Sequence, residues 1–159
     1  MSSETDRTEP TVQTATPTTS DWKHGAIGGL AGGILMGILF MTMMPPVIEH
    51  TIPALFGLDG LLAGWVVHLF NSVVFGIVFS AILSQSPLRE YADSVGGSAG
   101  LGIVYGIGVW ILAAGIVMPL WLSAVGFPNA PPLPNFSTMS LVAHVVYGLV
   151  LGVVYAYSS

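Results

Sequence analysis

HGAIGGLAGGILMGILFMTMM, residues His24–Met44, is the stretch that decides the fold, and it contains no Asp, Glu, Lys or Arg. The hydrocarbon core of a bilayer is about 30 Å thick and a helix rises about 1.5 Å per residue, so roughly 20 apolar residues cross it. The run is continuous rather than alternating, and it far exceeds the roughly 10 residues of a barrel strand. The stretch therefore predicts a transmembrane helix that ends at Pro45-Pro46.

Three further segments satisfy the same length rule: Leu61–Leu83, Val95–Trp121 and Met139–Tyr157. The Val95–Trp121 segment is longer than a span needs, so we expect it to tilt or to bend near Pro119. The predicted fold class is all-α, a polytopic membrane four-helix bundle built from two tandem transmembrane hairpins. This transmembrane domain covers residues 23–159.

The composition agrees with a membrane protein. Hydrophobic residues make up 53% of the chain and charged residues 7%, against about 25% charged in a soluble protein. There is no cysteine, which excludes disulfides, thiolate metal sites and cysteine nucleophiles. Acidic residues outnumber basic ones eight to three, and an acidic exterior with a single lysine predicts a salt-adapted, halophile protein.

Residues 1–22 are predicted to be a disordered tail, because they are rich in Thr and Ser and lack apolar periodicity. The tail is acidic at Glu4, Asp6 and Glu9, whereas a secretory signal begins with basic residues. Arg7 and Lys23 precede the first predicted span, Arg89 lies between the second and third, and the other two loops contain no Lys or Arg. The positive-inside rule then predicts a multi-pass protein of the cell membrane with both termini in the cytoplasm.

The chain shows signs of an internal repeat. With a shift of 76 residues His68 aligns with His144, and with a shift of 74 Met44-Pro45 aligns with Met118-Pro119. This pattern predicts two duplicated hairpins related by an axis along the membrane normal, although helices rich in Gly and Val also resemble one another by composition.

Small residues recur at helical spacing and predict close helix packing. The glycines expected at helix contacts are Gly25, Gly29, Gly33, Gly37, Gly76, Gly102, Gly106, Gly148 and Gly152.

His68 and His144 are the main candidate functional residues, with Asn71 and Ser72 beside the first of them. Each histidine is predicted about 8–11 Å inside the outer end of its span, and ionisable residues at such depth often mark function. A matched pair could ligate haem, hold a metal ion or relay protons. Alternatively, each imidazole bonds a backbone carbonyl or a neighbouring polar side chain and only joins helices.

The predicted outer loops add Glu49, His50 and Asp59 to the candidates. Met43, Met44 and Met118 lie at outer helix ends, and thioethers combined with His68 and His144 would suit copper. The alternative is that these methionines are packing residues and the polar ones are wetted loop. The proline-rich stretch Phe127–Phe136 is expected to lie along the outer interface as a lid or a docking surface.

Four motifs carry a family resemblance. They are Gly-Gly-x-x-Gly-Gly in the first span, Met-Met-Pro-Pro at its exit, Gly-Trp-x-x-His at 64–68 and His-x-x-Tyr-Gly at 144–148. With these motifs the chain resembles a family of small, uncharacterised four-span prokaryotic membrane proteins, frequent in halophilic archaea and sometimes labelled histidine kinases. The kinase label has no support here, because no soluble ATP-binding domain fits outside the spans.

No phosphate loop, zinc-protease motif or nucleophile elbow is present, so we expect a protein that is not an enzyme. The first expectation is an accessory or assembly subunit of a membrane complex. The alternatives are a small transporter or channel, and an electron-transfer protein that binds haem or copper. No cofactor is predicted outright. The expected partners are the lipid bilayer and another membrane subunit or a second copy of the chain, and not nucleic acid.

Overall fold

The computed structural model describes residues 19–85 and 87–159. The predicted tail lies outside the described residues up to position 18. Helix α1 spans Thr19–Met43, so the last four residues of the predicted tail are helical instead.

Four helices are long and apolar enough to cross a membrane. They are α1, α3 (Leu61–Leu83), the continuous helix formed by α5 (Val95–Val109), η2 (Trp110–Val117) and α6 (Met118–Ala124), and α7 (Thr138–Ser158). The described residues contain no strand. The predicted all-α membrane bundle of two helical hairpins is therefore confirmed.

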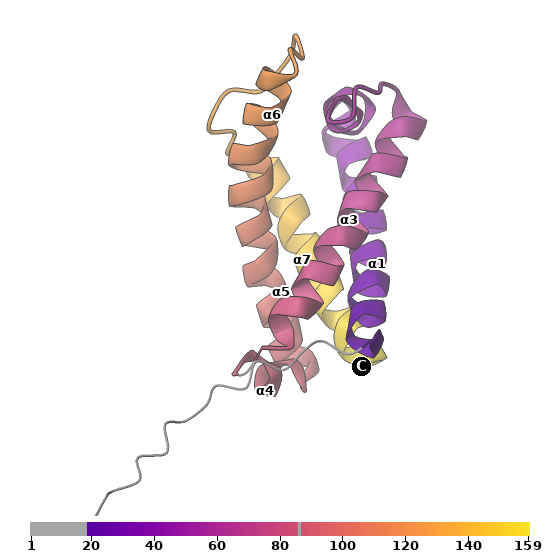
Figure 1. Ribbon diagram of the computed structural model, residues 1–159, viewed down its shortest axis with the longest axis vertical. Coiled ribbons are helices and arrows are strands. Elements are labelled where there is room, and N and C mark those ends of the chain that lie inside the picture. The colour runs from indigo at the N-terminus through magenta and orange to yellow at the C-terminus, as the bar shows by residue number, and fades with distance from the viewer. Residues whose placement is uncertain (1–18, 86) are drawn as a thin grey trace, which may run out of the picture.

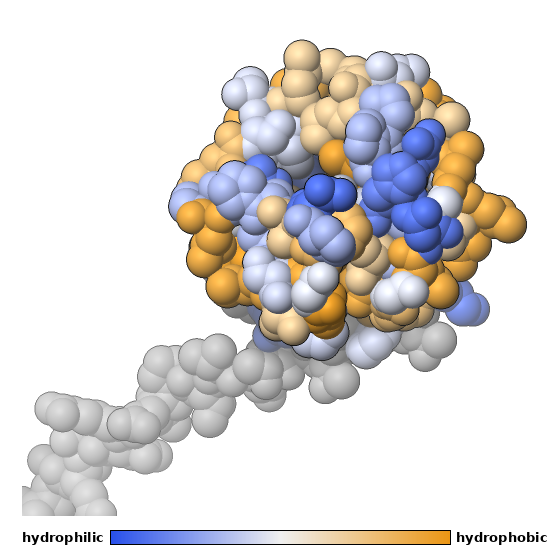
Figure 2. Space-filling view, turned by 90° about the horizontal axis from the view of Figure 1, so that it is seen from above, coloured by the Kyte–Doolittle hydropathy of each residue, from blue (hydrophilic) through white to orange (hydrophobic). Residues whose placement is uncertain are grey.

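Short elements connect these helices. The π-helical turn η1 (Val47–Thr51) and the short helix α2 (Ile52–Ala54) follow Pro46, and α4 (Leu88–Ala92) joins the two hairpins. We call the end of the bundle with η1 and α6 the η1 end, and the opposite end the α4 end (Figure 1). Seen from the η1 end, hydrophilic residues gather on the end face and hydrophobic residues surround it (Figure 2), as a membrane-spanning bundle requires.

Glycines set the closest helix contacts. A Cβ added at Gly76 on α3 would meet the carbonyl oxygen of Gly25 and, at 2.8 Å, the Cα atom of Gly29 on α1. A Cβ added at Gly148 on α7 would similarly meet the backbone of α5 at Gly102. Every glycine that the sequence singled out for packing has an atom of another helix within 3 Å of its added Cβ. These contacts hold α1 against α3 and α5 against α7.

The contact between the hairpins is uneven. Helix α1 of the first hairpin also packs along α7 of the second. This contact joins the two hairpins. Helices α3 and α5 share little contact and diverge toward the η1 end (Figure 1). At the α4 end the bundle is filled by the buried side chains of Phe79, Leu83, Leu151 and Tyr155.

The third span departs from α-helical geometry before Pro119 rather than at it. Residues Trp110–Val117 form η2, a π-helical segment. Proline has no N–H, so position 119 cannot donate to the carbonyl of Gly115 as an α-helix would require. The N–H of Asn135 donates to that carbonyl instead, with an N–O distance of 2.9 Å. The proline-rich segment therefore folds back along η2, where Phe136 packs against Trp110 with ring centroids 5.1 Å apart.

Candidate functional site

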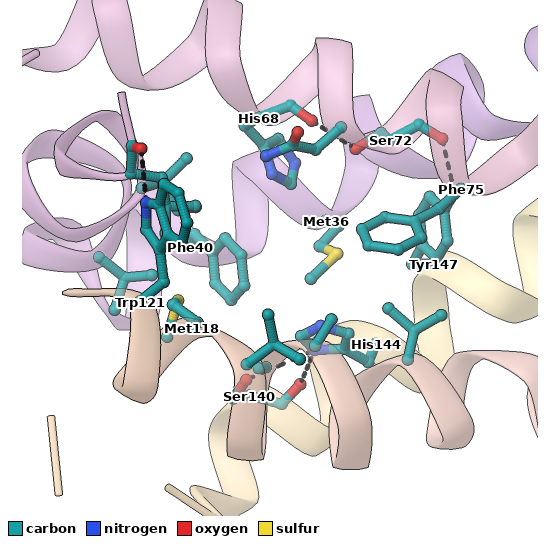
Figure 3. Close-up of a pocket in the computed structure, with 18 of the residues that line it drawn as sticks. Met36, Phe40, His68, Ser72, Phe75, Met118, Trp121, Ser140, His144 and Tyr147 are labelled. Carbon is teal, nitrogen blue, oxygen red and sulfur yellow. Dashed lines mark hydrogen bonds between the residues drawn. The ribbon is translucent and has the colours of Figure 1, made fainter. Parts of the chain in front are cut away.

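A cavity of about 430 Å³ lies between the two hairpins, toward the η1 end, where α3 and α5 diverge. Its lining comes from all four spanning helices and from the η1–α2 segment, and most of it is apolar. The predicted site residues His68, Ser72 and His144 line it (Figure 3), and so does Asn71. The fold thus brings together both intramembrane histidines, which lie on different hairpins.

His68 is 5% exposed and is tied to α1. Its Nε2 atom lies 2.9 Å from the carbonyl oxygen of Gly33. A carbonyl can only accept, so Nε2 carries the hydrogen and Nδ1 keeps an unshared electron pair. Gly33 allows this approach because it has no side chain in the α1–α3 contact.

His144 is 7% exposed and is held within its own helix. Its Nδ1 atom donates to the carbonyl oxygen of Ser140, with a distance of 2.7 Å, and the Ser140 hydroxyl lies 3.4 Å from the same nitrogen. The Nε2 atom therefore keeps the unshared electron pair. The described residues offer no hydrogen-bond partner to Nδ1 of His68 or Nε2 of His144, and neither atom is sealed from the surface.

Two residues of α1 lie between the histidines. The Phe40 ring meets His68 edge-on with centroids 5.7 Å apart, and it meets His144 in the same way at 6.4 Å. The imidazole centroids are therefore no farther apart than the sum of those two distances. Met36, one helical turn from Phe40, lies between the two imidazoles (Figure 3). Both α1 side chains are almost fully buried.

Polar side chains one helical turn from the histidines, toward the α4 end, already donate hydrogen bonds to backbone carbonyls. The Ser72 hydroxyl donates to the carbonyl of His68, and the Tyr147 hydroxyl donates to the carbonyl of Ser72, both at 2.7 Å. Within residues 19–85 and 87–159, no hydrogen bond engages the side-chain amide of Asn71, which lines the cavity between the two histidine-bearing hairpins.

Besides the bond from Tyr147 to Ser72, two hydrogen bonds join the hairpins on the side where α3 and α5 diverge. Toward the η1 end, the indole N–H of Trp121 donates to the carbonyl of Leu55 at 2.9 Å. Toward the α4 end, the Tyr105 hydroxyl donates to the carbonyl of Phe75 at 2.7 Å. Between these bridges α3 and α5 have little contact, and the cavity, which is only partly enclosed, is lined by residues of both helices.

The predicted outer cluster forms a separate group. His50 Nδ1 lies 2.7 Å from a carboxylate oxygen of Asp59, and its Nε2 lies 3.9 Å from Glu49. The hydrogen bond with Asp59, helped by the charges of Asp59 and Glu49, raises the pKa of His50 above its usual 6.5. None of the three residues lines the cavity.

The methionines proposed as copper ligands are divided by the fold. Met118 lines the cavity with both histidines, whereas Met43 is exposed and Met44 packs against the hydrophobic core. In residues 19–85 and 87–159 no group of three or more His, Asp and Glu side chains is placed to hold a metal ion.

Sequence reasoning missed several residues that shape the site: Met36, Phe40, Tyr147 and Trp121. Met36 and Phe40 are four residues apart and look like ordinary packing. Tyr147 follows His144 by one helical turn in the motif His-x-x-Tyr-Gly, and its hydroxyl within an apolar span was the available signal.

Comparison with known proteins identifies the family of this chain but indicates no activity. Neither the curated proteins nor the solved structures contain a match to this chain. One family model matches residues 19–159, which include every helix described above. The chain belongs to the family of unknown function DUF6789.

Proposed function

We propose that this protein binds a small, largely apolar molecule inside the membrane, in the cavity between its hairpins. The observation that carries this is the pair of buried imidazoles, each with one ring nitrogen bonded to a carbonyl and the other left to the cavity. The volume of about 430 Å³ falls within the range of small-molecule sites, and such sites combine apolar walls with a few polar groups.

A purely structural role accounts for the hydrogen bond made by one ring nitrogen of each histidine, but not for the position of the other nitrogen at the cavity. Joining helices requires the bond from His68 to Gly33, and that bond uses one nitrogen. The second ring nitrogen of each imidazole has no hydrogen-bond partner among the described residues and lies at a largely apolar cavity. An occupant that donates a hydrogen bond would pair with it.

The cavity is only partly enclosed and lies where α3 and α5 diverge, which supports entry from the lipid phase. The bridges from Trp121 to Leu55 and from Tyr105 to Phe75 bound this region above and below. A molecule dissolved in the bilayer would reach the cavity through this region without crossing the polar headgroups.

Two broader features belong to the same proposal. Lys23 and Arg89 lie on the side of the α4 end, so the positive-inside rule supports a cytoplasmic α4 end and an η1 end outside. The similar edge-on contacts of His68 and His144 with Phe40 are consistent with duplication of an ancestral hairpin, although the two rings bond different carbonyls through different nitrogens.

The experiment compares molecules that co-purify with the protein. Ala113 lines the cavity, whereas its neighbour Leu112 is 62% exposed on the outside of the same span. We expect native mass spectrometry of protein from its own membranes to show a stoichiometric bound molecule in the wild type and in Leu112→Phe, but not in Ala113→Phe. Its absence from the wild type, or its persistence in Ala113→Phe, would contradict the proposal.

An accessory subunit is the second candidate, and the exposed face of α5 favours it. The third span is the least buried of the four, and added Cβ atoms at Gly96, Gly100 and Gly108 meet no atom within 4 Å. Small residues on a lipid-facing helix permit close approach of another membrane helix. Gentle extraction should then recover a partner subunit that Gly100→Leu releases, and unchanged recovery would count against this role.

Transport and redox chemistry have less support. A transport path would have to pass the α4 end, where Phe79, Leu83 and Leu151 pack among fully buried residues. A copper ion would require Met36 or Met118 beside the free histidine nitrogens. Metal analysis and an absorption spectrum of the same preparation test for copper and haem.

A further inference from the structure

We infer that the cavity selects molecules that carry a hydroxyl group on an apolar ring, such as a phenol or a hydroquinone. Equally apolar molecules that only accept hydrogen bonds should bind less well. This inference rests on the proposed function and adds the chemical class of the ligand.

The direction of the two backbone bonds fixes which nitrogens can accept. Nε2 of His68 donates to Gly33 and Nδ1 of His144 donates to Ser140, so both hydrogens of the neutral rings are used. Each ring therefore presents an acceptor, and not a donor, to the cavity. A doubly protonated ring would place a charge in a lining whose described residues include no carboxylate.

The neighbouring hydroxyls do not reverse this preference. The hydrogens of Ser72 and Tyr147 are directed at the backbone carbonyls of His68 and Ser72. The Ser140 hydroxyl lies beside Nδ1 of His144, and the Asn71 amide can donate and accept equally. Among the ring nitrogens and hydroxyls described in this cavity, Nδ1 of His68 and Nε2 of His144 thus remain as acceptors without a partner, and Asn71 adds no preference of its own.

The walls favour a ring as the apolar part of the ligand. Phe40, Phe75 and Tyr147 contribute aromatic faces and edges, and Met36 adds a thioether between the histidines (Figure 3). Aromatic rings pack well against both kinds of group. A hydroquinone satisfies the acceptors, whereas the corresponding quinone has only carbonyl oxygens and leaves them unpaired.

A matched pair of probes tests this selectivity: para-hexylphenol and its methyl ether, para-hexylanisole. The two differ only at the oxygen, where a methyl group in the ether replaces the hydroxyl hydrogen of the phenol. Binding is measured by equilibrium dialysis on the full chain in phosphatidylcholine nanodiscs, and partition into empty nanodiscs is subtracted. We expect the phenol to bind at least about fivefold more tightly, as one added hydrogen bond implies.

Variants then connect the selectivity to the two rings. His144→Leu and His68→Leu should each weaken phenol binding and leave ether binding nearly unchanged. Ala113→Phe should remove the binding of both probes. Equal affinity of wild-type protein for both probes, with both lost in Ala113→Phe, would overturn the hydroxyl selectivity and leave the binding cavity intact. Saturable binding of neither probe to the wild type would count against the proposed function itself.

Discussion

The hydroxyl of Tyr147 on α7 donates a 2.7 Å hydrogen bond to the backbone carbonyl of Ser72 on α3. The two residues are 75 positions apart and belong to different hairpins. This bond forms the floor of the cavity just below His68 and His144, and both partners line that cavity. It therefore contributes both to the association of the hairpins and to the shape of the site.

Removing that hydroxyl should loosen the two hairpins. We expect Tyr147→Phe to lower the free energy of unfolding by about 1 kcal/mol, the usual net value of a buried hydrogen bond. Unfolding in mixed micelles with increasing dodecyl sulfate measures this. Tyr157→Phe is the control, because Tyr157 is 77% exposed. Equal stability of both variants would show that the Tyr147 bond adds nothing.

The glycine contact between α1 and α3 should not accept a larger side chain. In Gly76→Leu the new Cβ meets the backbone of Gly25 and Gly29, so the helices must separate. We expect a loss of about 3 kcal/mol, at the upper end for overpacking. Gly100→Leu is the matched control, since nothing lies within 4 Å of its added Cβ. A Gly76→Leu protein as stable as this control would contradict the packing described.

The contact between Gly115 and Phe136 should anchor the proline-rich segment. In Gly115→Ala the added Cβ collides with the Phe136 ring, which has to move away from Trp110. Hydrogen exchange at the Asn135 amide, which bonds the Gly115 carbonyl, should then become faster. Gly108→Ala on the same span meets no atom and should stabilise the helix by up to about 1 kcal/mol. Unchanged protection of Asn135 in Gly115→Ala would argue against this anchor.

The outer cluster should depend on pH through His50. Its hydrogen bond with Asp59 raises its pKa, so the pair contributes stability that is complete below about pH 6.5 and is lost as the pH rises through the folded pKa. Asp59→Asn should return the pKa of His50 toward 6.5, as NMR titration of its ring protons can show. Glu49→Gln should have a smaller effect, because Glu49 is 3.9 Å away. A larger shift in Glu49→Gln than in Asp59→Asn would contradict this assignment.

The spans were predictable from the sequence because they depend on a local property. Twenty or so apolar residues must form a helix to cross lipid, whatever their neighbours are. The end of the first span followed from Pro45. The third span begins at Val95 as expected, where the side chain of Ser94 caps α5 by accepting from the N–H of Gly97 at 3.0 Å. The packing faces followed from the four-residue spacing of glycines such as Gly25 and Gly29.

The cavity was not predictable, because it depends on how the hairpins diverge. The bond from Trp121 to Leu55 joins residues 66 positions apart, and nothing in either local sequence indicates it. The carbonyl of Gly115 in the π-helical segment η2 finds its donor in Asn135, on a segment with no regular structure, and the local sequence does not indicate this pairing. His68 and His144 could be singled out as a pair, but their position in one cavity with Met36 between them required the fold.

The central claim is that His68 and His144 each present an unprotonated nitrogen to a ligand within the membrane. Nitrogen NMR of histidine-labelled protein in nanodiscs tests it most directly, because protonated and unprotonated ring nitrogens have well-separated shifts. We predict one of each kind for both residues at neutral pH. Para-hexylphenol should shift only the unprotonated nitrogens, and Ala113→Phe should abolish that response. Two protonated nitrogens on either ring, or no response of the wild type to the phenol, would contradict the account.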